Sequence, residues 1–434
     1  MVNVSRRKLA RSPPHLRLLL LLVLIALGAT HCAPVTWNDA SRMATVQSVV
    51  ESGSFVIEQT EFADTGDKVF INGHFYSDKP PMPSVLGAVV YYPLYHLGLG
   101  FHGHVRLDYF LVTLLTVSLF WILGTLAFFY SLQFTGMDPE QRLLAALALG
   151  LGSIFFSWST TFNNHELAAG FLAIGFYFLL RARFETHVRR HLAIAGFFVA
   201  LAGTADVPTA VFYVALLLPI TCHPQLRRNM VFYFAPLLLT VAPYLAINYS
   251  IHHSIVPVQI VRSYFEYPGS PWIGSDQLSG MRPNSLGFIC SYALLTLVGP
   301  KGFLLYNPFI FVGIWGMVRA IRRNGPFAYE GVAVAVGTLI LMFYYWVTSD
   351  NSAGWSYSIR WFVPLLPLLF FFLHPYFEIL DKRRETVFQA LLCVSVVIAA
   401  VGALNPWSPL PYSEISFVAN IKQFVAHLHR PPPL

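Results

Sequence analysis

Two residues with complementary chemistry lie at the two ends of the first long polar loop of the chain. Asp39 lies near its start and is a carboxylate that can remove a proton from a hydroxyl group. Lys79 lies at its end, before Pro80-Pro81, and is a suitable point charge for binding a phosphate. Each also has a structural explanation, because Asp commonly caps helices and a lysine ahead of an apolar helix commonly extends to the membrane surface. Together they predict proton transfer beside a bound phosphate.

Other polar residues of the predicted outer segments are candidates for substrate binding: Arg42, Asp78, His165, Glu166 and Asp206. Asp206 breaks an apolar stretch, where an acid is costly unless it faces a cavity or a partner. Lys301 and Arg360 precede late apolar segments and are expected to help bind an anion, because cations of both kinds pair with phosphate oxygens. The alternatives are structural: His165 as a surface histidine, Glu166 at a helix start, and Arg360 as an interface anchor.

The composition requires that these residues be positioned by membrane helices. The chain has 434 residues, of which 56% are hydrophobic and 11% are charged, whereas a soluble domain has about 25% charged residues. Apolar runs of about 20 residues are long enough to cross a bilayer as helices. We therefore predict an all-α, polytopic integral membrane protein in a single transmembrane domain spanning 1–434, since backbone groups in lipid must be satisfied internally. Eleven spans are expected, near 16–33, 108–132, 143–160, 167–182, 191–205, 208–222, 230–248, 303–320, 328–347, 361–375 and 386–404.

Clusters of Lys and Arg predict the orientation. They lie at Arg6–Arg17, Arg181–Arg190, Arg227-Arg228, Arg319–Arg323 and Lys382–Arg384. Short basic loops of this kind face the cytoplasm, which places the N-terminus inside and argues against nucleic-acid binding as the reason for the net charge of +7. The five clusters agree only if the apolar stretch Pro83–Leu99 does not cross, so we expect it to lie in the outer interface.

This topology assigns three segments to the outer face: a first external loop at 34–105 with juxtamembrane helices, a long external loop at 249–302, and a tail at 405–434. An amphipathic helix is expected over Asp39–Glu51, because its apolar residues fall on one stripe. The first apolar segment is predicted to be an uncleaved helix, although it also has features of a signal peptide. The cysteines show no metal or redox spacing, and a Cys32–Cys290 disulfide is one open alternative.

At this point the first loop resembles a known family. The pieces Asp39-Ala40-Ser41-Arg42, Glu51-Ser52-Gly53 and Asp78-Lys79-Pro80-Pro81 are similar to the first periplasmic loop of polyprenyl-phosphate-dependent glycosyltransferases of the GT-C type. Protein O-mannosyltransferases and the lipid A aminoarabinose transferase belong to that group. Two later segments, Gly354–Leu366 and Pro300–Pro308, also resemble outer-loop motifs of bacterial members.

The resemblance implies a role for each matching residue. Asp39 would be the catalytic base, Lys79 would bind the donor phosphate with help from Arg360 or Lys301, and Asp78 takes the acidic position before the lysine. The donor would be a polyprenyl-monophosphate sugar, attacked in a single inverting displacement on the outer face of a bacterial inner or plasma membrane. The acceptor would be the hydroxyl of a glycan, lipid or protein. A second acid often follows the aspartate, and here Ala40 stands there, so a divalent metal stays an open question.

Two other function classes stay open. A lipid or solute transporter, or a flippase, would normally show repeats and broken helices at mid-membrane, and no repeat is visible in this sequence. A non-catalytic membrane partner is the other alternative, and Ala40 leaves room for it.

Overall fold

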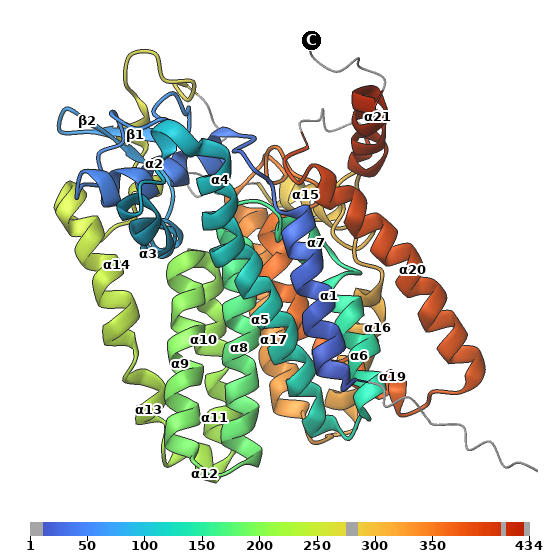
Figure 1. Ribbon diagram of the computed structural model, residues 1–434. Helices are drawn as coiled ribbons and strands as arrows, with labels where there is room; N and C mark the ends of the chain where they lie inside the picture. Colours follow the sequence, from blue (N-terminus) through green and yellow to red (C-terminus); the bar gives the residue numbers. More distant parts are fainter. Residues whose placement is uncertain (1–11, 275–284, 409–413, 429–434) are drawn as a thin grey trace, which may run out of the picture.

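The computed structural model describes residues 12–274, 285–408 and 414–428 and is dominated by helices (Figure 1). The basic start of the chain before residue 12, residues 275–284 within the long loop and parts of the tail lie outside the described residues. The bundle contains α1 (Pro14–Ala29), α4 (Phe101–Thr113), α5 (Leu119–Ser131), α6 (Pro139–Gly150), α7 (Ile154–Trp158), α8 (Asn164–Phe184), α9 (Val188–Ala205), α10 (Val211–Ala215), α11 (Leu217–Cys222), α12 (Pro224–Arg227), α13 (Val231–Phe234), α14 (Leu237–His252), α16 (Phe309–Arg322), α17 (Ala328–Thr348), α18 (Leu366–Phe371), α19 (His374–Phe377) and α20 (Lys382–Leu404). The elements outside this bundle are α2 (Trp37–Glu51), β1 (Lys68–Ile71), β2 (His74–Ser77), α3 (Pro81–His96), α15 (Leu286–Val298) and α21 (Ser416–Leu428).

The prediction of a polytopic helical membrane protein is confirmed. Among the described residues, six helical segments are long and apolar enough to cross a bilayer, and they are Phe101–Thr135, Asn164–Phe184, Val231–His252, Ala328–Thr348, Arg360–Phe377 and Lys382–Leu404. Three shorter apolar helices, Pro14–Ala29, Val207–Cys222 and Leu286–Val298, accompany them. The count of eleven spans stays a prediction, because short and broken helices are not identified as spans by length alone.

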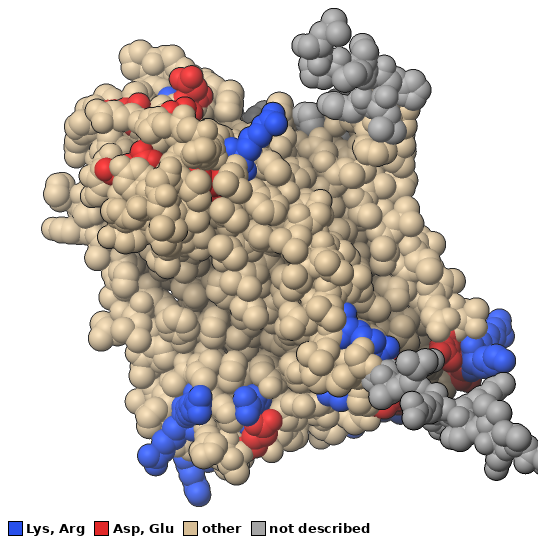
Figure 2. Space-filling view, in the orientation of Figure 1, with Lys and Arg blue, Asp and Glu red and all other residues tan. Residues whose placement is uncertain are grey.

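The first loop forms a compact unit at one end of the bundle, where α2, α3 and the two strands lie together (Figure 1). Helix α3 begins at Pro81, a residue suited to the first turn because its fixed φ angle is already helical. It packs against α2 and is not among the segments with the length and apolarity of a span. In Figure 2, red acidic side chains gather over this unit, whereas most of the blue Lys and Arg side chains lie at the opposite end of the molecule. Most basic side chains in this view therefore lie at one end of the molecule, and the cytoplasmic position of that end stays a prediction.

A β-hairpin within the first loop was not expected from the sequence analysis. Strands β1 and β2 pair antiparallel, with Lys68 opposite Ser77 and Ile71 opposite His74. The turn uses Asn72 and Gly73, whose φ angles are +52° and +90°. Asn-Gly is the commonest two-residue turn of this type, because both positions need positive φ. The hairpin therefore brings the residues just before β1 and just after β2 side by side.

The structure differs from the predicted elements in two other ways. The expected span at 143–160 is broken into α6 and α7. Gly152 lies at the break, where an added Cβ atom would be 2.9 Å from the Ala148 carbonyl oxygen, and the Ser153 hydroxyl caps α7. The expected outer loop and tail also contain helices, α15 and α21. All four cysteines are free thiols, so Cys32 and Cys290 form no disulfide.

Candidate active site

A cavity of about 1020 Å³ lies between the first loop and the bundle. Its wall combines residues from α2, the hairpin ends, the start of α8, the break after α9 and the segment before α18. The charged and ionisable residues on its wall are Arg42, Asp67, Asp78, Lys79, His165, Asp206 and Arg360, with Tyr344 and Tyr345 among its tyrosines. Its aromatic wall also includes Trp37, Trp272, Trp355, Trp361 and Trp407. Apolar walls with a few placed polar groups are typical of small-molecule sites.

Lys79 is held between two carboxylates at the open end of the hairpin. Its Nζ atom lies 2.8 Å from Asp67 Oδ2 and 2.8 Å from Asp78 Oδ2. The pairing follows from the register of the hairpin, because Asp67 precedes β1 and Asp78 follows β2. Burial raises the pKa of the Asp78 carboxyl, whereas the positive charge of Lys79 lowers it. The charge of Lys79 is therefore already balanced by its neighbours.

Arg42 projects from α2 into the cavity and is almost fully buried. Its guanidinium donates to the Asn38 carbonyl at 2.8 Å and to Asn164 Oδ1 at 2.6 Å, while its Nε has no hydrogen-bond partner among the described residues. Burial lowers the pKa of Arg42 to about 10, although Asp78 and Asp67 act in the opposite direction. The guanidinium nevertheless stays charged at neutral pH.

Arg360 approaches the cavity from the segment before α18. Its NH1 donates to the Trp355 carbonyl at 3.0 Å, and its guanidinium lies 4.8 Å from the ring centre of Trp407. Its Nε, like that of Arg42, is buried without a partner in the described part of the chain. The two guanidinium groups act on each other electrostatically, and neither forms an ion pair with a carboxylate within the described residues. The arginines thus form a positive region that no described acid neutralises directly.

His165 and Asp206 meet at the cavity wall, where α8 begins and α9 ends. The His165 Nδ1 atom lies 2.9 Å from Asp206 Oδ2, and both side chains are buried against the protein while lining the cavity. Asn163 starts α8 by accepting a hydrogen bond from the Glu166 backbone N–H at 2.9 Å. The dyad brings together two predicted site residues that are 41 positions apart.

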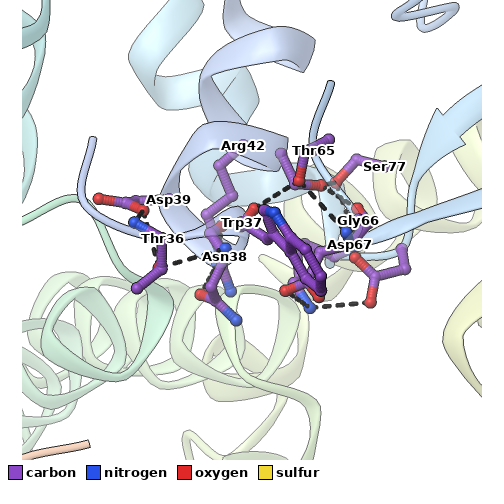
Figure 3. A network of polar contacts seen from close by, with 12 residues as sticks. Thr36, Trp37, Asn38, Asp39, Arg42, Thr65, Gly66, Asp67 and Ser77 are labelled. Carbon is purple, nitrogen blue, oxygen red and sulfur yellow. Dashed lines mark hydrogen bonds and ion pairs between the residues drawn. The ribbon is translucent and has the colours of Figure 1, made fainter. Parts of the chain in front are cut away.

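Asp39 caps α2, which is one of the two roles that the sequence left open for it, and it lies off the cavity wall. It is fully buried and does not belong to the cavity lining. Its carboxylate accepts hydrogen bonds from the backbone N–H groups of Val35 and Thr36, both at 2.8 Å, and from the hydroxyl groups of Thr36 and Tyr109 at 2.8 and 3.0 Å. Figure 3 shows it turned toward Thr36, with Asp67 on the other side of Arg42. Thr36 and Asp39 form a reciprocal capping box, so this carboxylate fixes the start of α2.

Two other predicted residues also lie off the cavity wall. Glu166 is fully buried, and its two carboxylate oxygens have no partner among the described residues. Lys301 donates a hydrogen bond to the Gly354 carbonyl at 2.8 Å, and Gly354 itself lines the cavity. Burial, followed by the nearby charge of Arg360, lowers the pKa of Lys301 to about 8. Lys301 therefore acts on the site through the loop that carries Gly354.

Sequence reasoning did not single out three residues that complete the site: Asp67, Asn164 and Trp407. The Asn72-Gly73 turn was a signal for Asp67, because a hairpin centred there must bring the residues before and after it together. In the described ranges, no group of three or more His, Cys, Asp or Glu side chains has an arrangement that could hold a metal ion.

Comparison with known proteins gives the fold. No protein-family model matches the sequence, and no curated protein matches it. Among solved structures, ArnT from Cupriavidus metallidurans bound to undecaprenyl phosphate is similar, with a TM-score of 0.55, 13% identity, and coverage of 90% of this chain and 69% of ArnT. The apo oligosaccharyltransferase of Archaeoglobus fulgidus is similar over 91% of this chain, with a TM-score of 0.55 and 14% identity.

The chain spans 56% of the length of that archaeal enzyme and 63% of apo ArnT. The archaeal oligosaccharyltransferase AglB from Archaeoglobus fulgidus, solved with an inhibitory peptide and a dolichol-phosphate, is similar as well, with a TM-score of 0.54 and 14% identity. At 13% and 14% sequence identity, this similarity shows a shared fold. The protein therefore has the GT-C fold, which is the polytopic membrane architecture shared by ArnT and the archaeal oligosaccharyltransferase.

Proposed function

We propose that this protein is a membrane glycosyltransferase that moves a sugar from a polyprenyl-monophosphate donor to an acceptor hydroxyl. The observation that carries the proposal is the pair Arg42 and Arg360, two cavity-lining guanidinium groups without a carboxylate partner among the described residues. A buried charge without a counter-charge is unfavourable by several kcal/mol. A bound phosphate would supply that counter-charge, and guanidinium groups are well suited to phosphate oxygens.

In this proposal Arg42 and Arg360 hold the donor phosphate, and Lys79 contributes less than the family resemblance implies. Lys79 already has two carboxylates at 2.8 Å, so it would have to give one up to bind a phosphate directly. Lys301 adds a further positive charge near Arg360. These cations would stabilise the negative charge that develops on the leaving phosphate.

Two observations support the proposed donor and the proposed orientation in the membrane. ArnT has been solved with undecaprenyl phosphate and the archaeal protein with a dolichol-phosphate, which supports a lipid monophosphate as the ligand of this cavity. The cavity lies at the end of the bundle that carries the acidic first loop, so we place it on the outer face, with the N-terminus in the cytoplasm. Displacement of the phosphate in one step would invert the configuration at the anomeric carbon.

Asp39 is the base implied by the resemblance, and in the described conformation it would first have to leave its capping bonds. An acid that caps α2 also fixes Arg42 one turn further along the same helix. A positional role for Asp39 therefore fits the geometry without any movement.

A binding measurement tests the phosphate site. Purified protein in nanodiscs should bind undecaprenyl phosphate, as measured by native mass spectrometry against a competing phosphatidylglycerol. Arg42→Gln or Arg360→Gln should weaken binding about thirtyfold each, because losing a buried charged contact costs about 2 kcal/mol or more. Arg106→Gln, at an exposed arginine of α4, is the matched control. Equal binding by wild type and both cavity variants would contradict the proposal.

A further inference from the structure

The cavity contains a histidine–carboxylate pair whose geometry is that of a general base with its orienting acid. Asp206 Oδ2 lies 2.9 Å from His165 Nδ1. An acceptor on Nδ1 favours the tautomer with its proton there, which leaves Nε2 with a lone pair. Within the described residues Nδ1 is the ring nitrogen that makes a hydrogen bond, and the ring lines the cavity.

The backbone around Asp206 holds the carboxylate in place. Its N–H donates to the Ala202 carbonyl at 2.9 Å and closes the last turn of α9. Its own carbonyl accepts from the Thr209 N–H at 2.8 Å and from the Thr209 hydroxyl at 2.7 Å. The capping bond from Asn163 fixes the start of α8 and with it His165. Both members of the pair are therefore set by helix ends instead of by a free loop.

The other acids near the cavity are less available for proton transfer. Asp67 and Asp78 are both paired with Lys79. Asp39 is off the cavity wall and accepts hydrogen bonds from at least four donors. Among the described wall residues, His165 thus combines a free acceptor position with an orienting partner.

Charged groups from several elements surround the ring. Asp206, Arg360 and Arg42 all act on His165 electrostatically. Glu166 follows it in α8, with both carboxylate oxygens buried and unpartnered in the described part of the chain. The two arginines that we assign to the donor phosphate therefore lie near the pair, so a base there would be close to the reacting sugar.

We propose that His165, oriented by Asp206, is the general base that removes the proton of the acceptor hydroxyl; this inference rests on the proposed function. The hydroxyl oxygen forms a bond to the anomeric carbon while the bond from that carbon to the phosphate oxygen breaks. The electron pair of the broken bond leaves on the lipid phosphate, and the hydroxyl proton moves to His165 Nε2. The resulting imidazolium is stabilised by Asp206 and then loses its proton to water.

Substitutions that keep the hydrogen bond but remove the base test this inference. In His165→Asn the amide nitrogen can still donate to Asp206, but the side chain takes up no proton. Single-turnover sugar transfer should fall by about 10²–10⁴-fold, the usual contribution of a general base. Binding of undecaprenyl phosphate should stay within about threefold of wild type. His102→Asn, at an exposed histidine of the same end of the molecule, should transfer sugar at the wild-type rate.

The pH dependence separates a base from a merely structural histidine. Wild-type transfer should rise with pH as the base loses its proton, and that rise should be absent from the residual activity of His165→Asn. Asp206→Asn should lower the rate without removing the rise. If His165→Asn bound lipid phosphate and transferred sugar at the wild-type rate, this inference would be overturned and the proposed function would stand. If His165→Asn lost both lipid phosphate binding and sugar transfer, the inference would also be overturned, because His165 would then be a residue that binds the donor.

Discussion

Replacing Lys79 with Gln tests the conclusion that this lysine mainly balances two carboxylates. Its Nζ is 2.8 Å from both Asp67 and Asp78, and the three side chains are only 15%, 11% and 10% exposed. Removing the cation would leave two acids close together in a poorly solvated place. Removing one partner of a buried ion pair destabilises a protein by about 3–5 kcal/mol.

We expect the loss at the lower end of that range, about 3 kcal/mol, because the acids can take up a proton instead of staying charged. Burial already raises the pKa of Asp78, and loss of Lys79 would raise it further. The destabilisation should therefore be largest near neutral pH. It should shrink as the pH falls, since protonation removes the negative charge that Lys79 balances.

Thermal unfolding in detergent measures this effect. Lys79→Gln should melt below wild type, and the triple variant Lys79→Gln, Asp67→Asn, Asp78→Asn should recover much of the loss, because amides can bond to one another without a net charge. Lys382→Gln, at an exposed lysine, is the control for loss of a positive charge. If Lys79→Gln had the melting temperature of wild type at pH 7 but no longer bound lipid phosphate, the lysine would be a phosphate ligand and the reasoning would be wrong.

Three further predictions concern other parts of the site. Because the pKa of Lys301 is lowered to about 8, the affinity for undecaprenyl phosphate should decline as the pH rises through about 8, and a pH titration of Lys301→Gln should lack that decline. Asp39→Ala should destabilise the protein by about 0.5–2 kcal/mol, the usual contribution of a helix cap, because two backbone N–H groups at the start of α2 lose their acceptor; melting at the wild-type temperature would contradict the capping role. Gly73→Val should increase protease cleavage in the first loop, because a β-branched residue is strained at a φ of +90°, whereas cleavage at the wild-type rate would mean that the turn does not limit the stability of the hairpin.

The class of the protein could be predicted from the sequence because apolar run length and low charge content are summed over many residues. Asp39 and Lys79 drew attention to the first long polar segment, and residues of that segment line the cavity. Their surroundings could not be predicted. Whether Lys79 faces a substrate or Asp67 depends on the register of the hairpin, which one turn decides.

Long-range contacts explain the rest of what sequence reasoning missed. His165 and Asp206 were each candidates, but their pairing depends on how α8 and α9 align at their ends. At the break between α6 and α7, the Ile154 N–H donates to Asn307 Oδ1 at 2.9 Å, a contact between residues 153 positions apart. Periodicity reports which face of a helix is apolar, and it carries no information on which neighbour that face meets.

The central claim is most directly tested by single-turnover transfer from a labelled polyprenyl-monophosphate sugar, with wild type and the double variant Arg42→Gln, Arg360→Gln in proteoliposomes. Acceptors of the glycan, lipid and peptide classes would be supplied in parallel on the outer side. The account predicts that wild type moves the label to an acceptor hydroxyl with release of lipid phosphate. The double variant should lose transfer by about 10³-fold, from two contacts of about 2 kcal/mol each. Label that crosses the bilayer still attached to its lipid, with none transferred, would contradict the account and identify a transporter.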